Sequence, residues 1–296
     1  MHVSRLLVAS WLSGIATHLC REQWVILVIG KLPPYSNDLV LISPRDSFFG
    51  DRFNLTVTKD LALKNEIVGN ATSSDGANWI EMITGCYAGL PAKCPRTLWN
   101  FAFAGADIDP AILTLHHDYT VDMTEQVDQW VQAWKSKLLK APAKSSLAAF
   151  FIGINDTGDV SGWKNITDWT AFWNTEMDSY FKAVDQVYNT GLRSFLFLNV
   201  PNRIGTNPQI ATFNSLLKER IEIFKASKKD VTTIFFDTNK LFADVLANAA
   251  AYGFTNTTGY CQCTDPGYFW YNSGHVTEPV HRLIANGVLD ALQKAK

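Results

Sequence analysis

Four residues, spread over most of the chain, could together carry out hydrolysis at a carbonyl group. Ser47 could supply a nucleophilic hydroxyl and Gly105 a backbone N–H. Asn155 could add a side-chain amide, and His275 could accept the serine proton. Such a serine needs a base within hydrogen-bond reach and donors aimed at the oxyanion that develops on the attacked carbonyl. Taken singly, a serine, glycine or asparagine after a strand is more often a turn or cap residue, so the signal is their order along the chain.

The apolar pattern of the chain predicts the elements that would position these residues. Predicted buried strands are 39–42, 98–103, 147–152, 194–200 and 232–236, and predicted helices are 78–84, 123–139, 169–190, 210–227, 240–250 and 280–296. Strands that alternate with helices imply a parallel sheet covered on both faces, here a three-layer α/β/α sandwich with five parallel strands. No repeat or composition break divides the chain, so we expect one domain over 39–296. The residues that follow the strands then meet at the carboxyl edge of the sheet.

The chain resembles the SGNH, or GDSL-like, hydrolases in four blocks of sequence that occur in the family's order. These blocks are Asp46-Ser47, Asn100-Phe-Ala-Phe-Ala-Gly-Ala106, Phe151-Ile-Gly-Ile-Asn-Asp-Thr-Gly158 and Phe269-Trp-Tyr-Asn-Ser-Gly-His275, and they are most similar to those of secreted fungal acetylesterases. The resemblance implies the flavodoxin-like fold of that family. It also implies Ser47 as nucleophile, His275 as base, and an oxyanion hole made by Gly105, Asn155 and the Ser47 N–H. Asp46 and Asp156 would support these groups, and no metal or cofactor is needed.

The first block departs from the family pattern next to the nucleophile. Phe49-Gly-Asp-Arg52 is similar to the family's Phe-Gly-Asp-Ser, but arginine stands at the nucleophile and cannot attack a carbonyl. The family pattern continues from Gly-Asp-Ser to Gly-Phe-Asn-x-Thr, and Asp46-Ser47 leads at that spacing to Arg52-Phe-Asn-Leu-Thr56. We therefore favour Ser47. Arg45 replaces the family glycine and Pro44 precedes it, and both residues could strain a turn that glycine makes easily.

The last block departs at the acid that would orient the histidine. The family commonly has Asp-x-x-His-Pro, whereas Asn272 and Val276 occupy these positions here. An asparagine carbonyl can accept the ring N–H, although the Asp-to-Asn change costs roughly 10⁴ in turnover in the serine-protease template. Asn272, a Ser–His dyad, and a different acid at Asp237 or Asp265 all stay open.

Three other histidines compete with His275 for a functional role. They are His116, His117 and His281, and we interpret all three as solvated surface residues.

Cysteines, sequons and the N-terminus predict a secreted glycoprotein. Residues 1–20 combine a short positive region with an apolar run too brief to span a bilayer, which is typical of a signal peptide. Cys86 with Cys94 and Cys261 with Cys263 form two local pairs that suit small disulfide loops, with zinc binding as the alternative. Acceptor sequons for glycosylation stand at Asn54, Asn70, Asn165 and Asn256. A fifth, at Asn155, should be bare because a glycan there would block the reaction.

The net charge of the chain and its family resemblance limit the partners and substrates that we expect. With 26 basic and 28 acidic residues the net charge is −2, so the chain lacks the basic excess that nucleic acid or an anionic membrane requires. We expect a monomer without stable membrane insertion, and the resemblance implies acetylated saccharides or small acetates as substrates. Tryptophans could form a sugar platform or belong to the core; they are Trp163, Trp169, Trp173 and Trp270.

Two other functions stay open. A short-chain lipase or phospholipase is the nearest enzymatic alternative. A catalytically silent carbohydrate-binding or interaction protein is the alternative from another class, and the departures at Pro44, Arg45, Asn272 and Val276 support it.

Overall fold

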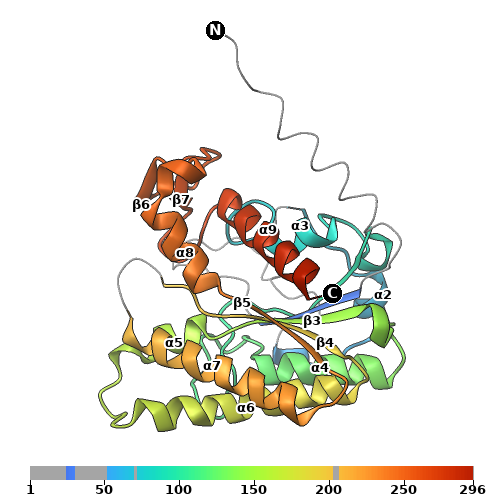
Figure 1. Cartoon of the computed structure of the whole chain (residues 1–296). Helices are drawn as coiled ribbons and strands as arrows, with labels where there is room; N and C mark the ends of the chain where they lie inside the picture. Colours follow the sequence, from blue (N-terminus) through green and yellow to red (C-terminus); the bar gives the residue numbers. More distant parts are fainter. Residues whose placement is uncertain (1–24, 31–51, 70–71, 203–206, 296) are drawn as a thin grey trace.

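A parallel sheet lies at the centre of the computed structural model, with helices on both of its faces (Figure 1). The structure describes residues 25–30, 52–69, 72–202 and 207–295. The strands are β1 Val25–Gly30, β2 Thr97–Asn100, β3 Ser146–Phe151, β4 Ser194–Leu198 and β5 Thr232–Phe236. They pair in the order β2-β1-β3-β4-β5, and every pairing is parallel. The prediction of a parallel sheet covered by helices is confirmed.

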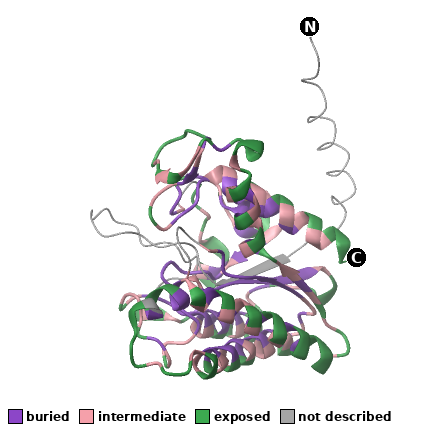
Figure 2. Cartoon of the chain, turned by 60° about the vertical axis from the view of Figure 1, so that its left-hand side comes forward, coloured by how far each residue is buried: buried purple, intermediate pink, exposed green. Residues whose placement is uncertain are grey.

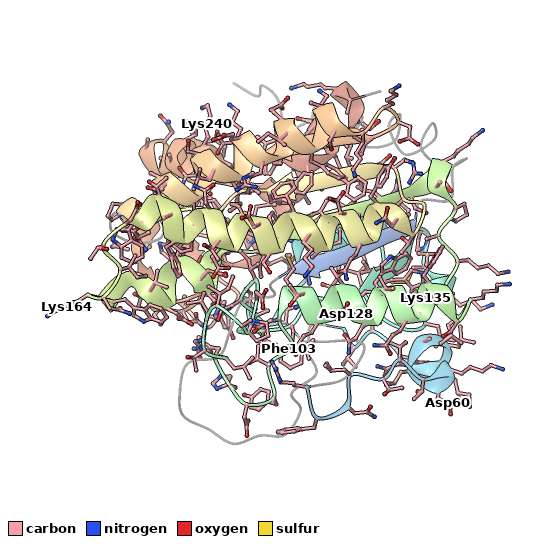
Figure 3. All side chains as sticks on the ribbon, turned by 90° about the horizontal axis from the view of Figure 1, so that it is seen from below. Asp60, Phe103, Asp128, Lys135, Lys164 and Lys240 are labelled. Atoms are coloured by element: carbon pink, nitrogen blue, oxygen red, sulfur yellow. A yellow bond between two sulfur atoms is a disulfide. The ribbon has the colours of Figure 1, made fainter. Side chains whose placement is uncertain are left out.

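The helices form two layers. As Figure 1 is drawn, α3 Trp79–Thr84, α8 Thr238–Ala247 and α9 Glu278–Lys294 lie above the sheet. Below it, α4 Met123–Lys135, α6 Trp169–Asn189 and α7 Pro208–Ser227 run side by side (Figure 3). Among the helices of the described ranges, none is long and apolar enough to cross a membrane.

Shorter elements complete the layers, and the sequence pattern missed most of them. They are α2 Lys59–Lys64, α5 Ile154–Asp159, a small sheet of β6 Asn256–Tyr260 and β7 Tyr268–Trp270, and 3-10 turns at Arg52–Asn54, Pro91–Lys93, Ala143–Ser145, Val160–Gly162 and Ala249–Tyr252. Of these, α5 matters most for the site because it follows β3 directly at the carboxyl edge of the sheet.

Two hydrophobic cores separate the sheet from the helix layers, and buried residues accordingly line both faces of the sheet (Figure 2). The lower core lies between the sheet and the helices α4, α6 and α7. It is rich in aromatic rings, which include Phe101, Phe103, Trp130, Phe150, Trp173, Phe197 and Phe213. The upper core, under α3, α8 and α9, includes Trp79, Leu147, Leu196, Phe269, Trp270 and Val276. Side chains of β3 and β4 alternate between the two cores, which is why these strands consist of continuous apolar residues.

The strand between β2 and β3 is not the one that the sequence predicted. The predicted strand 39–42 lies outside the described residues, and Val25–Gly30 occupies this central place. Val25 pairs with Thr97 and Ser146, and Gly30 pairs with Phe151. A central strand is buried on both faces and therefore needs an unbroken apolar run, which Val-Ile-Leu-Val-Ile supplies at greater length than Leu-Val-Leu-Ile. The sheet therefore includes residues before the predicted domain start at 39, while the predicted signal peptide, 1–20, lies outside the described residues.

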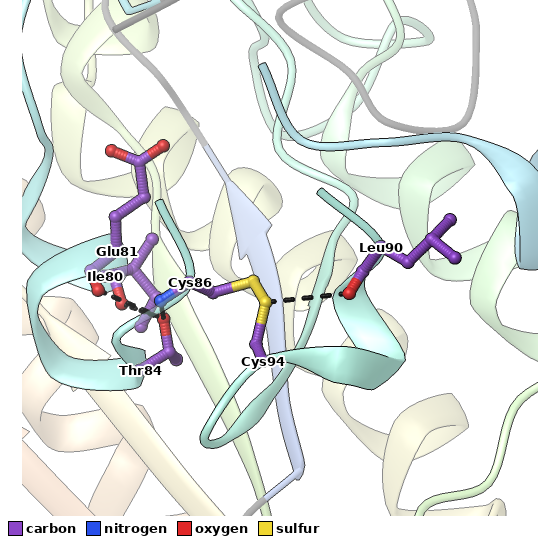
Figure 4. Close-up of a disulfide and its surroundings, with 6 residues drawn as sticks. All are labelled: Ile80, Glu81, Thr84, Cys86, Leu90 and Cys94. Carbon is purple, nitrogen blue, oxygen red and sulfur yellow. Dashed lines mark hydrogen bonds between the residues drawn. A yellow bond between two sulfur atoms is a disulfide. The ribbon is translucent and has the colours of Figure 1, made fainter. Parts of the chain in front are cut away.

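Both predicted cysteine pairs are disulfides. Cys86 is bonded to Cys94 beside the end of α3 (Figure 4), and Cys261 is bonded to Cys263. Oxidised sulfurs do not ligate zinc as thiolates, so the metal alternative for these four residues is wrong. Cys20 lies outside the described residues.

Gly153 makes the turn from β3 into α5 and packs tightly against its surroundings. Its φ is +103°, and a Cβ at this position would lie 2.4 Å from Cζ of Phe213 and 2.9 Å from Cγ2 of Val200. Gly191 has a similar φ of +99°, but no described atom lies within 4 Å of the place that its Cβ would occupy. A comparison of Gly153 with Gly191 therefore distinguishes the effect of backbone strain from that of steric overlap.

We expect Gly153→Ala to destabilise the protein more than Gly191→Ala. Both substitutions place a side chain in the left-handed region, at about 1–2 kcal/mol each. Only Gly153→Ala also overpacks the lower core, which adds about 1–3 kcal/mol. Urea unfolding of the two variants measures the difference, and equal losses would contradict the packing at this turn.

Candidate active site

Two turns at the carboxyl edge of the sheet are tied together by side chains of α5. Asn155 donates from Nδ2 to the carbonyl oxygen of Ala106 at 2.9 Å. Asp156 accepts from the backbone N–H of Ile108 at 2.8 Å. Because β1 lies between β2 and β3, these two bonds span the carboxyl end of β1. The bonds therefore hold the turn after β2 beside the turn after β3.

Gly105 stands in the turn after β2, one residue before the Ala106 carbonyl that Asn155 binds. Its φ is +77°, and a Cβ here would lie 3.2 Å from Cδ2 of His116. Only glycine adopts this conformation without strain and allows the ring to approach so closely. The structure thus brings two of the predicted oxyanion donors, Gly105 and Asn155, to neighbouring positions, with Asn155 only 4 % exposed.

His275 lies on the upper-core side of the sheet, at the end of a tight turn. Its carbonyl accepts the N–H of Tyr271 at 2.9 Å, and Asn272 accepts the N–H of Gly274 on Oδ1 at 2.9 Å. The next residue, Val276, pairs with Trp270 in a β-bridge. His275 is 2 % exposed, so the turn holds its ring inside the protein.

The remaining candidates for the triad acid are engaged elsewhere. Asp237 caps α8 by accepting the N–H of Lys240, and it also accepts Nδ2 of Asn199. Asp265 accepts the N–H of Gly267. The oxygen of Asn272 serves the turn that carries His275.

The predicted nucleophile and its neighbours lie outside the described residues. These are Pro44, Arg45, Asp46 and Ser47. The competing motif ends at Arg52, which is described. The N–H of Arg52 donates to the Tyr119 carbonyl at 3.0 Å, and its guanidinium lies 3.1 Å from the carboxylate of Glu125. Arg52 therefore ties the turn before α2 to the loop before α4 and to α4 itself.

The interpretation of the other histidines as solvated surface residues is wrong for His281. This residue is 5 % exposed, and its Nε2 lies 3.5 Å from Oγ of Ser74. Burial disfavours the charged ring and lowers the pKa of His281 to about 4. His116 and His117 are half-buried, and Nδ1 of His116 lies 3.1 Å from Oδ2 of Asp159.

The four tryptophans do not form a common exposed platform. Trp173 and Trp270 belong to the lower and upper cores, respectively. Trp169 is half-buried and stacks on Trp173, and Trp163 is 36 % exposed. The core alternative therefore holds for two of them.

The sequons differ in accessibility. Asn54 and Asn165 are exposed, whereas Asn256 is half-buried and accepts two backbone N–H groups within its own turn. Asn155 is buried, which by itself disfavours a glycan there. Asn70 lies outside the described residues.

A cluster of buried carboxyl groups beneath Asn155 escaped the sequence pattern. Asp107, Asp122, Asp156 and Glu176 are all fully buried. Within the described chain, neither carboxylate oxygen of Asp107 or of Glu176 has a hydrogen-bond partner. The one available signal was the position of Glu176 on α6, between the core residues Trp173 and Tyr180.

Burial raises the pKa of these carboxyl groups. The pKa of Asp107 rises to about 10, first because of burial and then because of repulsion by Asp156 and Asp122. Burial and the charge of Asp156 likewise raise the pKa of Glu176 to about 9, and burial raises that of Asp122 to about 8. At neutral pH these groups are therefore protonated, which removes negative charge from beneath the place where an oxyanion would form.

The fold and this edge define an α/β protein of the hydrolase-like kind, with its polar groups at the carboxyl ends of parallel strands. Residues 48–288 match the family model of the GDSL-like lipases and acylhydrolases. The chain belongs to this family and is a carboxylic ester hydrolase.

Curated relatives agree with this assignment. The chain is 27 % identical over 272 residues to an acetylesterase of Thermothelomyces thermophilus, covering 85 % of this chain and 87 % of that protein. It is 23 % identical over 241 residues to a GDSL esterase/lipase of Arabidopsis thaliana, covering 64 % of this chain and 62 % of the relative.

Two solved structures are similar at a lower level. One is a lipolytic G-D-S-L family member from Veillonella parvula, with 13 % identity, a TM-score of 0.46, and coverage of 92 % of this chain and 99 % of that one. The other is the α/β hydrolase LAE5 from a metagenome of Lake Arreo, with 15 % identity, a TM-score of 0.45, and coverage of 93 % and 97 %. Likeness at this level does not discriminate among related α/β folds.

We expect Glu176→Gln to stabilise the protein at pH 8 relative to pH 5. The pKa of Glu176 is raised from 4.5 to about 9, so the stability of the wild type is full below 4.5 and falls as the pH rises toward 9. Glutamine is neutral throughout and removes this loss. Thermal unfolding at both pH values measures it. The expected gain at pH 8 over that at pH 5 is up to about 4 kcal/mol, because folding of the wild type must return a proton to Glu176 at about 1.4 kcal/mol per pH unit in this range.

The control is Glu219→Gln, which changes an exposed carboxylate on α7. The same pH dependence of stability in wild type and Glu176→Gln would contradict the protonation of this cluster.

Proposed function

We propose that the protein is a secreted serine esterase that hydrolyses acetyl or other short-chain esters on carbohydrates. Ser47 is the nucleophile, His275 the general base, and Gly105, Asn155 and the Ser47 N–H form the oxyanion hole, on a flavodoxin-like SGNH fold. The observation that carries the proposal is the bond from Asn155 to Ala106, because it sets an amide donor beside the Gly105 turn, across the end of β1. The resemblance to a fungal acetylesterase supports the acetyl group as the acyl part.

In the proposed cycle, His275 takes the proton of Ser47 as Oγ attacks the ester carbonyl. The oxyanion hole binds the negative oxygen of the tetrahedral intermediate. His275 then gives its proton to the departing alcohol, which leaves an acyl-serine. Water attacks this ester with His275 again as base. His275 then returns the proton to Oγ of Ser47 as the C–Oγ bond breaks, and the carboxylic acid departs. No step uses a metal or a cofactor.

Asn272 has a positioning role in this proposal. Its Oδ1 accepts the Gly274 N–H, which closes the turn that carries His275. Ser74 supports the same turn by donating to the Val276 carbonyl at 2.6 Å. This turn thus positions the backbone of His275 in the proposal. Disulfides at Cys86–Cys94 and Cys261–Cys263 support passage through an oxidising compartment.

We also propose that residues 31–45 are an insertion within the nucleophile motif. The family's first block is Gly-Asp-Ser, and Asp46-Ser47 lacks its glycine because Arg45 precedes it. The strand β1 ends at Gly30, opposite the last residue of β3. Joining Gly30 to Asp46 would give Val-Ile-Gly-Asp-Ser at the end of β1 and would retain the spacing to Arg52-Phe-Asn. The fifteen residues 31–45 thus account for the departures at Pro44 and Arg45 together.

We expect Ser47→Ala to abolish hydrolysis of 4-nitrophenyl acetate and Asn155→Ala to lower kcat by roughly 10²–10³. The matched control is Asn174→Ala, since Nδ2 of Asn174 also donates to a backbone carbonyl at 2.9 Å but lies on α6. Steady-state assays and thermal unfolding of all three variants separate lost chemistry from lost folding. Wild-type turnover by a folded Ser47→Ala variant would contradict the proposed mechanism.

We expect deletion of residues 31–45 to raise kcat/KM for the same ester by about 10², the scale on which a misplaced reacting group loses rate. Deletion places Ser47 two residues after the end of β1. A chain in which 31–45 are replaced by a Gly/Ser segment of equal length serves as control and should match the full chain. Lower turnover in a folded deletion variant would exclude the insertion proposal, and Ser47→Ala in the deleted chain should be inactive.

A further inference from the structure

His116 forms an ordered pair with Asp159 directly beside the proposed oxyanion hole. Nδ1 of His116 lies 3.1 Å from Oδ2 of Asp159, with side-chain exposures of 29 % and 35 %. The Cδ2 edge of the same ring faces Gly105, at 3.2 Å from the place of a Cβ. Asp159 stands four residues after Asn155 on α5, so both side chains lie on one face of that helix. The pair is therefore fixed to the two turns that carry the oxyanion donors.

Two more rings continue from His116 along the same loop. The ring of His117 meets that of His116 edge-on, with centroids 4.8 Å apart, and stacks on Tyr119 at 4.9 Å. The N–H of Thr120 donates to the His117 carbonyl, and the N–H of His117 donates to Oγ1 of Thr120, which closes the turn. Tyr119 packs against the lower core, where its ring centroid lies 6.3 Å from that of Phe103. We call His116, His117 and Tyr119 the ring wall.

The ring wall and the proposed base lie on opposite faces of the sheet. Tyr119 contacts the lower core, and the loop leads into α4, which covers that face; Figure 3 shows Phe103 near the start of α4. His275 precedes Val276, which belongs to the upper core under α9. The carboxyl edge of the sheet thus separates them.

The geometry of the tetrahedral intermediate determines which of its substituents lies toward each face of the sheet. Its carbon bears the serine oxygen, the oxyanion, the oxygen of the leaving alcohol and the acyl carbon. His275 must reach both the serine oxygen and the leaving oxygen, so the alcohol departs on the upper side. The oxyanion points to Gly105 and Asn155. The acyl carbon is left with the lower side, beside His116.

We infer that the ring wall closes the acyl subsite and restricts the esterase to short acyl groups such as acetyl. The inference rests on the proposed function and deepens it by assigning the acyl preference to these residues. The Asp159 carboxylate on one edge and Gly105 on the other prevent the His116 ring from swinging aside. Asp159 is therefore a positioning residue, and His116 is the side chain that meets the acyl chain.

The experiment compares kcat/KM for 4-nitrophenyl acetate, butyrate and hexanoate in wild type, His116→Ala and Asp159→Asn. Removing the His116 ring should raise the butyrate-to-acetate ratio about tenfold or more, since each methylene that a pocket gains or excludes is worth roughly 10–200-fold. Asp159→Asn keeps the ring but weakens its anchor, so its ratio should shift in the same direction by less. Tyr252→Ala, which truncates an exposed ring remote from this edge, should leave all ratios unchanged.

An unchanged ratio in both variants, with wild-type thermal unfolding, would overturn the ring wall while leaving the esterase proposal intact. Loss of turnover on all three esters in folded His116→Ala would also overturn it, because His116 would then serve the chemistry rather than the acyl group. If His116→Ala does not fold, Asp159→Asn alone decides. Full turnover in Ser47→Ala is the separate result that would remove the proposed function itself.

Discussion

The site depends on two hydrogen bonds that cross the end of a central strand. Asn155 binds the Ala106 carbonyl and Asp156 binds the Ile108 N–H, so the turns after β2 and β3 are held together over β1. Loops that follow parallel strands share an edge but have no backbone ladder between them. Side-chain bonds must therefore supply the register that the strands supply inside the sheet. Gly105 and Gly153 make these bonds possible, because each turns its chain with a positive φ in a tight space.

In the proposed mechanism, the sheet divides the chemistry between its two faces. The turn that carries His275 is packed into the upper core, and the loop that carries His116 is packed onto the lower core. A reaction at the edge between them can therefore receive a base from one face and a steric boundary from the other. The two tasks then rest on separate cores, so a change in one packing layer need not disturb the other.

Carboxyl groups buried near the carboxyl edge of the sheet would be costly to charge, and protonation avoids this cost. Asp107, Asp122 and Glu176 lie where water does not reach, and a charged form would meet both desolvation and mutual repulsion. Their raised pKa values keep these groups neutral near pH 7. Burial has the opposite effect on the pKa of His281, which it lowers, and this basic group is therefore neutral as well. Neutral forms of Asp107, Asp122 and Glu176 reduce the negative charge near the site, which lessens the repulsion of an anion that develops there.

The sequence by itself determined the alternation of strands and helices, the two disulfides and the glycine and asparagine turns, because these follow from local spacing and residue type. Only the tertiary structure decided that Val25–Gly30 is the central strand, that His281 is buried and that His116 pairs with Asp159. The apolar run of 25–29 looks the same in a leader as in a buried strand, and partners 43 residues apart leave no periodic trace. Sheet order and burial are properties of the assembled layers, and no local pattern encodes them.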